Sequence, residues 1–282
     1  MTESSNVSLP AVSILGIGSM GRAILSGLLA PNVNVDGPIR VTNRTAASAA
    51  RLPEDNRVKS LITDDNPKAN LDAVEGADIV LVAVKPYMVA DLLDEIAPAL
   101  KPGAVIVSVA AGVTVATFEQ HLPSEVAVIR SMPNTPASVG RAVTGVSAGT
   151  RSTAAQLDVV KRLFSTVGEV LEVEESQLDA LSTISGSGPA YVFLLIEMLT
   201  AAAVEKGFSA EQAALLVNGT FIGATELLRQ SGSTPEQLRI QVTSPKGTTE
   251  RALSVLQDAH LDDLFIEATD AALARARELA AG

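Results

Sequence analysis

Short runs of aliphatic and β-branched residues alternate with Ala- and Leu-rich stretches along residues 1–173 of the chain. Several of these runs are apolar at every position, which is typical of strands buried on both faces of a sheet. We predict strands at Val12–Gly16, Ile39–Thr42, Ile79–Val84, Val105–Val109, Val126–Ile129 and Val143–Ser147. Because strands that alternate with helical stretches form βαβ units, this part of the chain is predicted to be an α/β domain with a mainly parallel sheet.

The pattern changes after Val173, where strand signals end and helical periodicities continue to the C-terminus. The segment Pro189–Val204 has only Glu197 and Thr200 as polar residues, so it is expected to form a buried helix that is too short to cross a membrane. The other predicted helices offer it little cover and lie at residues 210–229, 249–258 and 262–279. We therefore predict two domains, residues 1–173 and residues 174–282. The second is all-helical and forms a homodimer or a higher homo-oligomer built from dimers.

Composition narrows the class of protein. The 282 residues carry 21 Lys and Arg against 32 Asp and Glu, a formal net charge of -11, and such an acidic chain repels phosphate backbones. With no Cys and only two distant His, His121 and His260, we expect neither a metal site nor thiolate chemistry. The N-terminus lacks the pattern of a signal peptide, and no stretch reaches the roughly 18 apolar residues of a membrane span. The sequence predicts a globular cytoplasmic protein without nucleic-acid or membrane partners.

A glycine-rich loop directly follows the first predicted strand. It reads Gly16-Ile17-Gly18-Ser19-Met20-Gly21 and opens a helix that is predicted to continue to Leu29. In such loops the first glycine allows a tight turn, the second lets the backbone approach a pyrophosphate, and the third allows close packing of helix and strand. The phosphates then lie on free N–H groups at the positive end of the helix. The motif predicts a Rossmann-type dinucleotide-binding domain; the alternative is a glycine-rich turn without a ligand.

The end of the second predicted strand indicates which dinucleotide is bound. An acidic residue there would accept a hydrogen bond from the 2′-hydroxyl of NAD, but the chain continues as Asn43-Arg44-Thr45. An arginine and two hydrogen-bonding side chains suit a 2′-phosphate instead. We therefore predict NADPH as the cofactor, with NADH as an alternative. The other interpretation of Arg44 is an ordinary solvated loop residue.

Further candidate loops follow other strands and precede two helices of the second half. Open α/β sheets bind ligands outside the carboxyl ends of their strands, where the chain has Ala83-Val84-Lys85-Pro86, Val109-Ala110-Ala111-Gly112 and Met132-Pro133-Asn134-Thr135-Pro136. Each of these loops alone could be a structural turn. In the helical half, two glycine-containing segments resemble ligand-binding loops, Ser185-Gly186-Ser187-Gly188-Pro189 and Ser244-Pro245-Lys246-Gly247-Thr248-Thr249, and at the second of them hydroxyls and free N–H groups meet at a helix start. The second suits a small carboxylate, and its alternative is an ordinary cap with Thr248 or Thr249 as the N-cap residue.

Taken in order, these motifs resemble those of pyrroline-5-carboxylate reductases, the last enzymes of proline synthesis. The resemblance extends from about Val12 to Leu279 and rests on GIGSMG at Gly16, AVKP at Ala83, VAAG at Val109, MPNTP at Met132, ESQLDA at Glu175, SGSGPAY at Ser185 and SPKGTT at Ser244. The combination of SGSGPAY with SP-x-GTT is its most specific part. The resemblance implies reduction of 1-pyrroline-5-carboxylate to L-proline, with hydride transfer from NAD(P)H to the ring imine carbon.

The same resemblance implies which residues bind the two ligands. The cofactor positions, with Arg44 added from the second strand and Gln241 from the helical half, are Leu15, Gly16, Ile17, Gly18, Ser19, Met20, Asn43, Arg44, Asn70, Ala83, Val84, Lys85, Pro86, Val109, Ala110, Ala111 and Gln241. The substrate positions are Glu175, Ser244, Gly247, Thr248 and Thr249. The family's loop usually reads SPGGTT, and Lys246 departs from it. A Cβ at this position constrains the backbone angles of the loop, while the added charge would favour a carboxylate.

The implied chemistry asks little of acid–base residues, because hydride attack on a protonated imine depends mainly on positioning and electrostatics. We assign the amides of Gly247 and Thr248 and the Ser244 side chain to the substrate carboxylate. Thr249 is the predicted catalytic residue, whose hydroxyl donates or relays a proton to the ring nitrogen. Glu175 is expected to stabilise the cation.

Two other functions fit parts of the sequence. A β-hydroxyacid dehydrogenase also joins a GxGxMG domain to a helical one, but it needs a Lys four residues after a Gly-x-Gly motif, where this chain has Val192. The second alternative is a non-enzymatic NADP-binding regulator. Loss of NADPH absorbance on addition of 1-pyrroline-5-carboxylate, compared with a 2-methyl-3-hydroxy acid in the reverse direction, distinguishes these functions.

Overall fold

The computed structural model describes residues 6–281, which form two compact units. The first unit comprises the chain up to Ser187 together with the residues from Leu273 onward, and the second comprises Gly188–Ala272. The sequence pattern changes at Val173, before the boundary between the two units. The segment between Val173 and Ser187 is helical, as in the second unit, but it packs against strands of the first unit.

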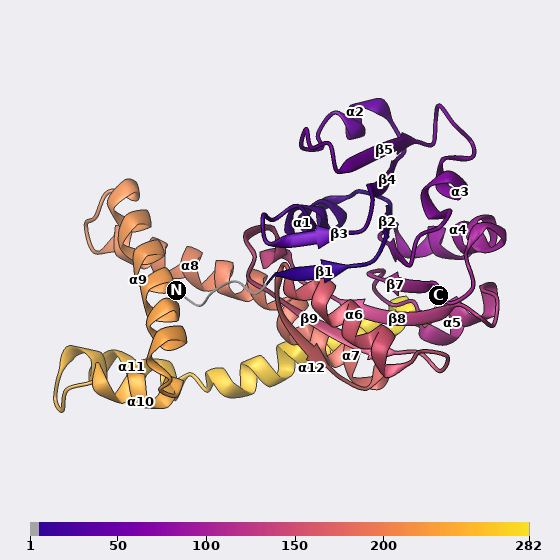
Figure 1. Cartoon of the computed structure of the whole chain (residues 1–282). Helices are drawn as coiled ribbons and strands as arrows, with labels where there is room; N and C mark the ends of the chain where they lie inside the picture. Colours follow the sequence, from indigo (N-terminus) through magenta and orange to yellow (C-terminus); the bar gives the residue numbers. More distant parts are fainter. Residues whose placement is uncertain (1–5, 282) are drawn as a thin grey trace. The chain divides into compact units, whose positions relative to one another are not determined.

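The first unit is built around a sheet of eight strands (Figure 1). Their order is β10-β9-β8-β7-β6-β2-β4-β5, and all neighbours are parallel except the antiparallel pair β8 and β9. The strands are β2 (Val12–Leu15), β4 (Ile39–Asn43), β5 (Val58–Ile62), β6 (Ile79–Val82), β7 (Val105–Ser108), β8 (Ala127–Met132), β9 (Ala142–Ala148) and β10 (Gly168–Glu172). A separate parallel pair joins β1 (Val7–Leu9) to β3 (Val33–Val35). The predicted α/β class with a mainly parallel sheet is confirmed.

Alternate residues of the central strands face two different layers of helices. In β6, Ile79 and Leu81 belong to a core cluster with α1 and α6, whereas Val80 and Val82 belong to a second cluster with α3, α4 and α5. All four side chains are at most 1% exposed, as expected of a strand that is buried on both faces. The helices are α1 (Ser19–Leu28), α2 (Ala46–Ala49), α3 (Ala69–Val74), α4 (Val89–Ile96), α5 (Val115–His121), α6 (Ala154–Ser165) and α7 (Leu178–Leu181).

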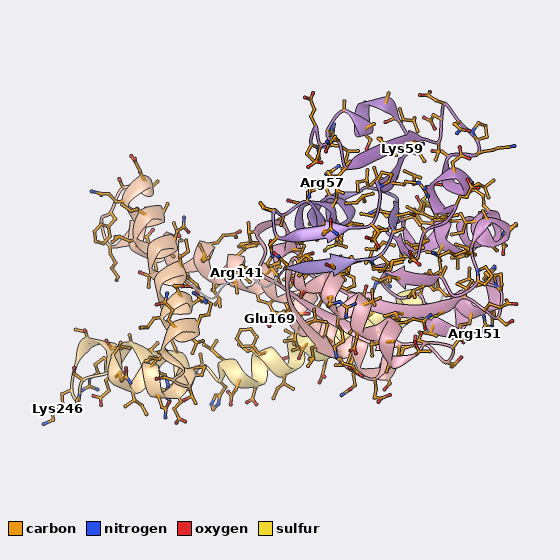
Figure 2. All side chains as sticks on the ribbon, in the orientation of Figure 1. Arg57, Lys59, Arg141, Arg151, Glu169 and Lys246 are labelled. Carbon is orange, nitrogen blue, oxygen red and sulfur yellow. The ribbon has the colours of Figure 1, made fainter. Side chains whose placement is uncertain are left out.

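The sequence pattern does not predict β1, β3, β5 and β10. Of these, β5 and β10 are the two edges of the large sheet, and both carry polar side chains. Figure 2 shows Lys59 on β5 and Glu169 on β10, two exposed residues that interrupt the apolar runs. Polar residues alternate with apolar ones in edge strands because only one of their faces packs on the core. The charged side chains also discourage pairing with another sheet.

Arg151 ties the loop after β9 to the C-terminal end of α5. Its Nη1 donates to the carbonyl oxygens of Leu122 at 3.2 Å and Pro123 at 3.1 Å, and its Nη2 donates to the carbonyl oxygen of Glu119 at 2.9 Å. These carbonyls lie at a helix end, where backbone oxygens lack helical partners. Arg151 therefore caps α5 at the end opposite to its first residue, Val115.

The second unit is helical throughout. Its helices are α8 (Gly188–Glu205), α9 (Ala210–Ser231), α10 (Pro235–Gln241), α11 (Thr248–Asp258) and α12 (Leu261–Ala281), the last of which continues into the first unit. The sequence pattern predicts all of them except α10. Ser209 and Thr234 begin α9 and α10 with capping boxes that are completed by Gln212 and Gln237.

No residue of α8 is buried within a single chain. Among the described residues of Gly188–Ala272, only the α9 side chains Ala213 and Val217 are buried apolar ones. Large apolar side chains are exposed over the whole unit and include Phe193, Leu195, Met198, Leu215, Ile222, Val255, Leu264 and Ile266. This exposure agrees with the expectation that the other helices of the chain offer the apolar helix little cover, and its burial by a second copy stays a prediction.

One continuous helical run, Glu175–Glu205, is long and apolar enough to cross a membrane by length and composition. It has 31 residues because the helical turns before Gly188 continue into α8, so the expectation of a helix too short for a span is wrong. A single run of this kind is weak evidence for a membrane span, since apolar core helices meet the same criterion.

Candidate active site

The glycine-rich loop has the backbone that a dinucleotide requires. Gly16 has a φ of 86°, and a Cβ on it would lie 2.8 Å from Val84 Cγ1. A Cβ on Gly21 would lie 2.8 Å from the Gly16 carbonyl oxygen, so this glycine is needed where α1 crosses the loop. Among the described residues other than its chain neighbours, no atom lies within 4 Å of a Cβ built on Gly18, so the middle glycine faces open space. The loop is thus tight at both ends and open in the middle, where a pyrophosphate would lie.

The N-terminus of α1 is available for an anion. Gly18 is the N-cap residue, and within the described chain no side chain caps the helix and no acidic residue lies in its first turn. The Gly16 N–H donates to Thr42 Oγ1 at 3.1 Å, which fixes the loop to the end of β4. The N–H groups of the first turn and the helix dipole therefore favour a negatively charged group.

The end of β4 places its three polar residues differently. Asn43 is 2% exposed, and its Nδ2 donates to Ser60 Oγ at 2.9 Å. Thr45 is the N-cap residue of α2 and accepts a hydrogen bond from the Ser48 N–H at 3.2 Å, which leaves its hydroxyl hydrogen able to donate to a phosphate. Arg44 is exposed. Of the three, only Arg44 is both exposed and charged, so its side chain is the one that can form an ion pair with a 2′-phosphate.

Two more predicted cofactor positions lie beside this edge of the sheet. Asn70, on α3, donates from Nδ2 to Glu95 Oε2 of α4 at 3.0 Å. Lys85 is exposed and is the N-cap residue of the short helix Pro86–Met88, which follows β6. The Ala83 N–H donates to the Leu15 carbonyl oxygen at 2.8 Å. The AVKP loop is thereby aligned with the glycine-rich loop at the carboxyl end of adjacent strands.

The carboxyl end of β7 carries the VAAG loop. The Val109 N–H donates to the Val82 carbonyl oxygen at 3.1 Å, and the Ala110 N–H donates to Ser108 Oγ at 3.3 Å. Ser131 Oγ of β8 donates to the Ser108 carbonyl oxygen at 2.7 Å. These bonds fix the wall of small residues next to the AVKP loop.

Glu175 lies close to this wall, in an ion-pair network. Its Oε1 accepts from the Val115 N–H at 2.7 Å and from Arg130 Nη1 at 3.4 Å, while Arg130 Nη2 donates to Asp179 Oδ1 at 2.7 Å. Arg130 lies on β8 and is 6% exposed. The sequence reasoning missed Arg130 and Asp179. The sequence signal that could have revealed them is the arginine inside the apolar run of β8, because a buried charge needs a partner of opposite charge.

The SGSG segment contains a π-helical turn. The turn covers Ser182–Gly186, immediately before α8. Asn134 of the MPNTP loop holds it, since Asn134 Nδ2 donates to the Ser185 carbonyl oxygen at 2.9 Å and Asn134 Oδ1 accepts from the Val143 N–H at 2.9 Å. π-turns inside helices occur frequently at functional sites.

In the second unit, the SPKGTT loop ends at the uncapped start of α11. Gly247 is the N-cap residue, and Thr248 and Thr249 are the first two helical residues. The alternative in which one of these threonines caps the helix is therefore wrong. Neither hydroxyl has a hydrogen-bond partner in the part of the chain that the structure describes. Ser244 and Gln241 are exposed, and Gln241 ends α10.

Lys246 has the left-handed backbone that glycine usually supplies. Its φ is 61°, and its N–H donates to Glu250 Oε2 at 2.8 Å. Figure 2 shows its side chain directed away from the helices α10 and α11, which the loop connects. The Gly247 N–H donates to the Ser244 carbonyl oxygen at 2.9 Å. The lysine thus keeps a glycine-like turn, with Glu250 holding the backbone.

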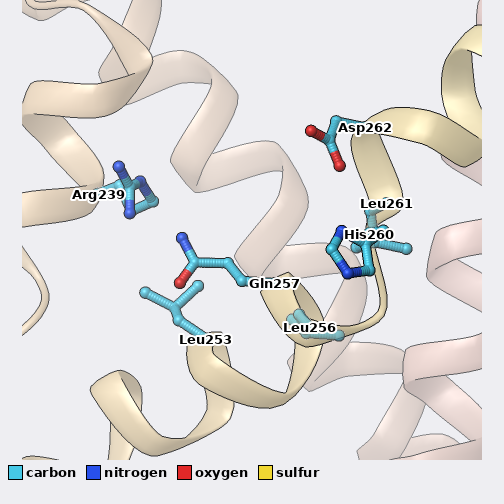
Figure 3. Close-up of a pocket in the computed structure, with 7 residues that line it drawn as sticks. All are labelled: Arg239, Leu253, Leu256, Gln257, His260, Leu261 and Asp262. Atoms are coloured by element: carbon cyan, nitrogen blue, oxygen red, sulfur yellow. The ribbon is translucent and has the colours of Figure 1, made fainter.

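A cavity of about 470 Å³ lies elsewhere in the second unit, between α10, α11 and the start of α12 (Figure 3). Its lining includes Arg239, Leu253, Gln257 and His260, and it contains none of the predicted site residues. Ligand atoms of His260, Asp262 and Asp263 lie within 4.8 Å of one another there, but all three residues are exposed.

The shifted pKa values lie away from the candidate site. A side-chain hydrogen bond from Arg57 lowers the pKa of Asp55 to about 2, and Glu172 raises the pKa of Lys161. Arg57 also donates to the Leu29 carbonyl oxygen at 2.7 Å, so this pair holds the loop before β5 to the end of α1.

A Rossmann-type sheet with an open phosphate loop, joined to a helical unit, is the architecture of a two-domain dinucleotide-binding protein. The family profile described as pyrroline-5-carboxylate reductase dimerisation matches residues 175–279. A profile described as NADP oxidoreductase, coenzyme F420-dependent, matches residues 11–112.

Individual relatives match nearly the whole chain. The pyrroline-5-carboxylate reductase of Corynebacterium melassecola is 38% identical over 274 residues, which cover 96% of this chain and 99% of the relative. A solved pyrroline-5-carboxylate reductase from Coxiella burnetii has a TM-score of 0.87 at 35% identity and covers 98% of this chain and 99% of its own. The Plasmodium falciparum pyrroline carboxylate reductase, solved with NADP bound, has a TM-score of 0.80 at 26% identity, over 96% and 98% of the two chains. The chain belongs to the pyrroline-5-carboxylate reductase family.

Proposed function

We propose that the chain reduces 1-pyrroline-5-carboxylate to L-proline with NADPH, the last step of proline synthesis. Residues 1–173 bind the cofactor and residues 174–282 bind the substrate and form the contact between copies. The family supports the reaction, and the residues of the two loops support the assignment of roles.

The glycine-rich loop fits a dinucleotide in its shape and in its charge. Gly18 leaves open space beside an uncapped helix start, where the phosphates would accept hydrogen bonds from the first-turn N–H groups. Arg44 would pair with the 2′-phosphate, and the AVKP and VAAG loops would flank the nicotinamide half. When bound, NADPH supplies the hydride at C4 of its nicotinamide.

The start of α11 carries the substrate assignment. The Gly247 N–H, assigned to the carboxylate from the sequence, already donates to the Ser244 carbonyl oxygen. Because Gly247 leaves the helix uncapped, the N–H groups of Thr248 and Thr249 can bind a carboxylate at the positive helix end instead. The Thr249 hydroxyl has no other partner among the described residues, so it can donate a proton to the ring nitrogen or relay one to it. The ring carbon receives the hydride and the nitrogen receives the proton, which balances the reduction of the C=N bond.

Glu175 adds negative charge near the VAAG loop. We propose that it stabilises the cationic imine, since an iminium carbon accepts hydride more readily than a neutral imine. The β-hydroxyacid dehydrogenase alternative still lacks a base, because Val192 of α8 occupies the position where that chemistry needs a lysine.

The direct test follows NADPH absorbance with the purified protein. We expect absorbance to fall when 1-pyrroline-5-carboxylate is added and proline to form in equal amount. A 2-methyl-3-hydroxy acid with NADP should give no signal in the reverse direction. NADPH binding without turnover of either substrate would favour the non-enzymatic regulator and overturn the proposal.

We further propose that the chain is a homodimer or a multiple of dimers. The family profile for dimerisation covers the helical unit, and α8 has no buried residue within one chain. A second copy packed on the exposed apolar side chains would complete this core. Sedimentation at micromolar concentration tests the proposal, and an active monomer would contradict it.

A cytoplasmic location is also part of the proposal. The support is the family, because the relatives that match nearly the whole chain are biosynthetic reductases. Fractionation of the cells of origin, with the reductase activity followed in each fraction, tests the location. Activity confined to the membrane or to the secreted fraction would contradict it.

A further inference from the structure

Arg130 is a buried cation that no role assigned above uses. A guanidinium at 6% exposure is costly unless carboxylates and hydrogen bonds surround it. Its two partners are Glu175 at 3.4 Å and Asp179 at 2.7 Å, each from the segment that precedes α8. Such a pair of ion contacts fixes the carboxylates as firmly as it fixes the arginine.

Through Glu175, Arg130 reaches the wall of the nicotinamide half. The same Glu175 Oε1 accepts from the Val115 N–H at 2.7 Å, and Val115 begins α5, separated from the VAAG loop only by Val113 and Thr114. In a doubly wound sheet the dinucleotide crosses the edge where the strand order reverses, here between β2 and β6. The adenosine half then lies at β4 and the nicotinamide half lies at β6 and β7, beside Val109–Gly112.

Through Asp179, the same arginine reaches the turn before α8. Ser182 Oγ donates to the Asp179 carbonyl oxygen at 3.0 Å, and Ser182 begins the π-helical turn. Asn134 holds the other end of this turn through the Ser185 carbonyl oxygen. One guanidinium therefore joins the VAAG loop and the SGSG segment, two motifs that are far apart in the sequence.

We propose that Arg130 is a positioning residue for hydride transfer, which acts by fixing Glu175 and, through it, the start of α5 and the VAAG loop. The inference rests on the proposed function. A shift of about 1 Å in a positioning group lowers turnover by about a hundredfold while leaving distant binding contacts intact.

The first test compares Arg130→Lys with a matched control, Arg151→Lys. Both arginines hold α5, but Arg130 acts at its first residue through Glu175 and Arg151 acts at its last carbonyls. Lysine keeps the charge and loses the two-pronged geometry. We expect Arg130→Lys to lower kcat by about 10- to 100-fold, with the Kd for NADPH changed by less than about threefold. Arg151→Lys should lower the Tm and leave kcat unchanged.

The second test is a double-mutant cycle with Glu175→Gln, which is isosteric and keeps an acceptor for the Val115 N–H. If Arg130 acts through Glu175, Arg130→Lys adds little loss of kcat in the Glu175→Gln background. Should Arg130→Lys fail to fold, Asp179→Asn replaces it as the second variant. Wild-type kcat in folded Arg130→Lys, or additive losses in the cycle, would overturn the inference. Wild-type protein without turnover of 1-pyrroline-5-carboxylate would instead overturn the proposed function, and this is measured first.

Discussion

In the sheet unit, Ile14, Leu81 and Phe118 are completely inaccessible, whereas in the helical unit Phe193, Leu195 and Met198 of α8 are 60%, 41% and 61% exposed. Both units are rich in apolar residues, yet only the first encloses them with its own helices. The difference teaches that helices without a sheet need a further layer, which one chain does not supply here. On the proposed assignment, one chain binds the cofactor by itself, while the SPKGTT loop belongs to a unit that we propose a second copy completes.

The most severe change targets the apolar surface of α8. Leu195→Glu places a charge on the surface that we propose a second copy covers, and desolvating it there would cost several kcal/mol. We expect loss of the dimer and complete loss of activity, measured by sedimentation and by the NADPH assay. Leu171→Glu is the matched control, since Leu171 is 52% exposed on β10 of the sheet unit. If both variants dimerise and turn over normally, the contrast between the units fails.

A smaller effect is expected from a substitution in the sheet unit, at the proposed 2′-phosphate site. Arg44→Ala should raise the KM for NADPH by roughly 10- to 100-fold, as expected for loss of a charge-assisted contact to the 2′-phosphate. The KM for NADH, which lacks this phosphate, should barely change. The dimer should remain intact, because Arg44 lies in the unit that completes its own core. Equal losses with both cofactors would remove Arg44 from the 2′-phosphate site.

Lys246→Gly tests the departure from the family's loop. A non-glycine residue in the left-handed region costs about 1 kcal/mol, so glycine at this φ of 61° should stabilise the helical unit by up to that amount. The Tm, measured at fixed protein concentration, should rise by a few degrees. If the lysine charge also attracts the substrate carboxylate, the KM for 1-pyrroline-5-carboxylate should rise as well. A lower Tm would show that the loop depends on the lysine side chain.

The smallest effect concerns acid stability of the sheet unit. Asp55 has a pKa lowered from 3.8 to about 2 by the Arg57 hydrogen bond, so its contribution is complete above pH 3.8 and is lost as the pH falls toward 2. Asp55→Asn should lower the Tm slightly at neutral pH, and its difference from wild type should vanish below about pH 2. A difference that stays constant from neutral pH to acid would mean that the ion pair is not its source.

The local pattern of apolar residues predicts the central strands because they are buried on both faces, as β6 and β7 show. It does not predict β5 or β10, whose edge positions leave them half polar. The roles of Gly16 and Gly21 follow from spacing alone, since a tight turn and a close crossing need no distant contact. The apolar character of α8 and the limited cover from its own chain follow from the sequence, whereas the extent of its exposure depends on how many chains share the core.

The network around Arg130 depends on tertiary contacts that local patterns do not contain. Its members come from β8, from the start of α5 and from the turns after Val173, which are separated by long stretches of sequence. Likewise, Thr45 and Thr249 both precede helical patterns, yet Thr45 is an N-cap residue and Thr249 is not. The position of the helix start decides the role, and helix ends are the least certain part of a sequence-based assignment.

Removal of the Thr249 hydroxyl tests the proposed reduction most directly. In Thr249→Ala we expect kcat to fall by about 10- to 1000-fold with NADPH binding and Tm nearly unchanged, because Gly247 and not Thr249 is the N-cap residue of α11. Thr249→Ser should recover much of the rate. The control is Thr153→Ala, which removes the capping box of α6 and should cost about 1 kcal/mol of stability without affecting kcat. A Thr249→Ala enzyme with a lowered Tm and wild-type kcat would contradict the assignment of proton transfer to this residue.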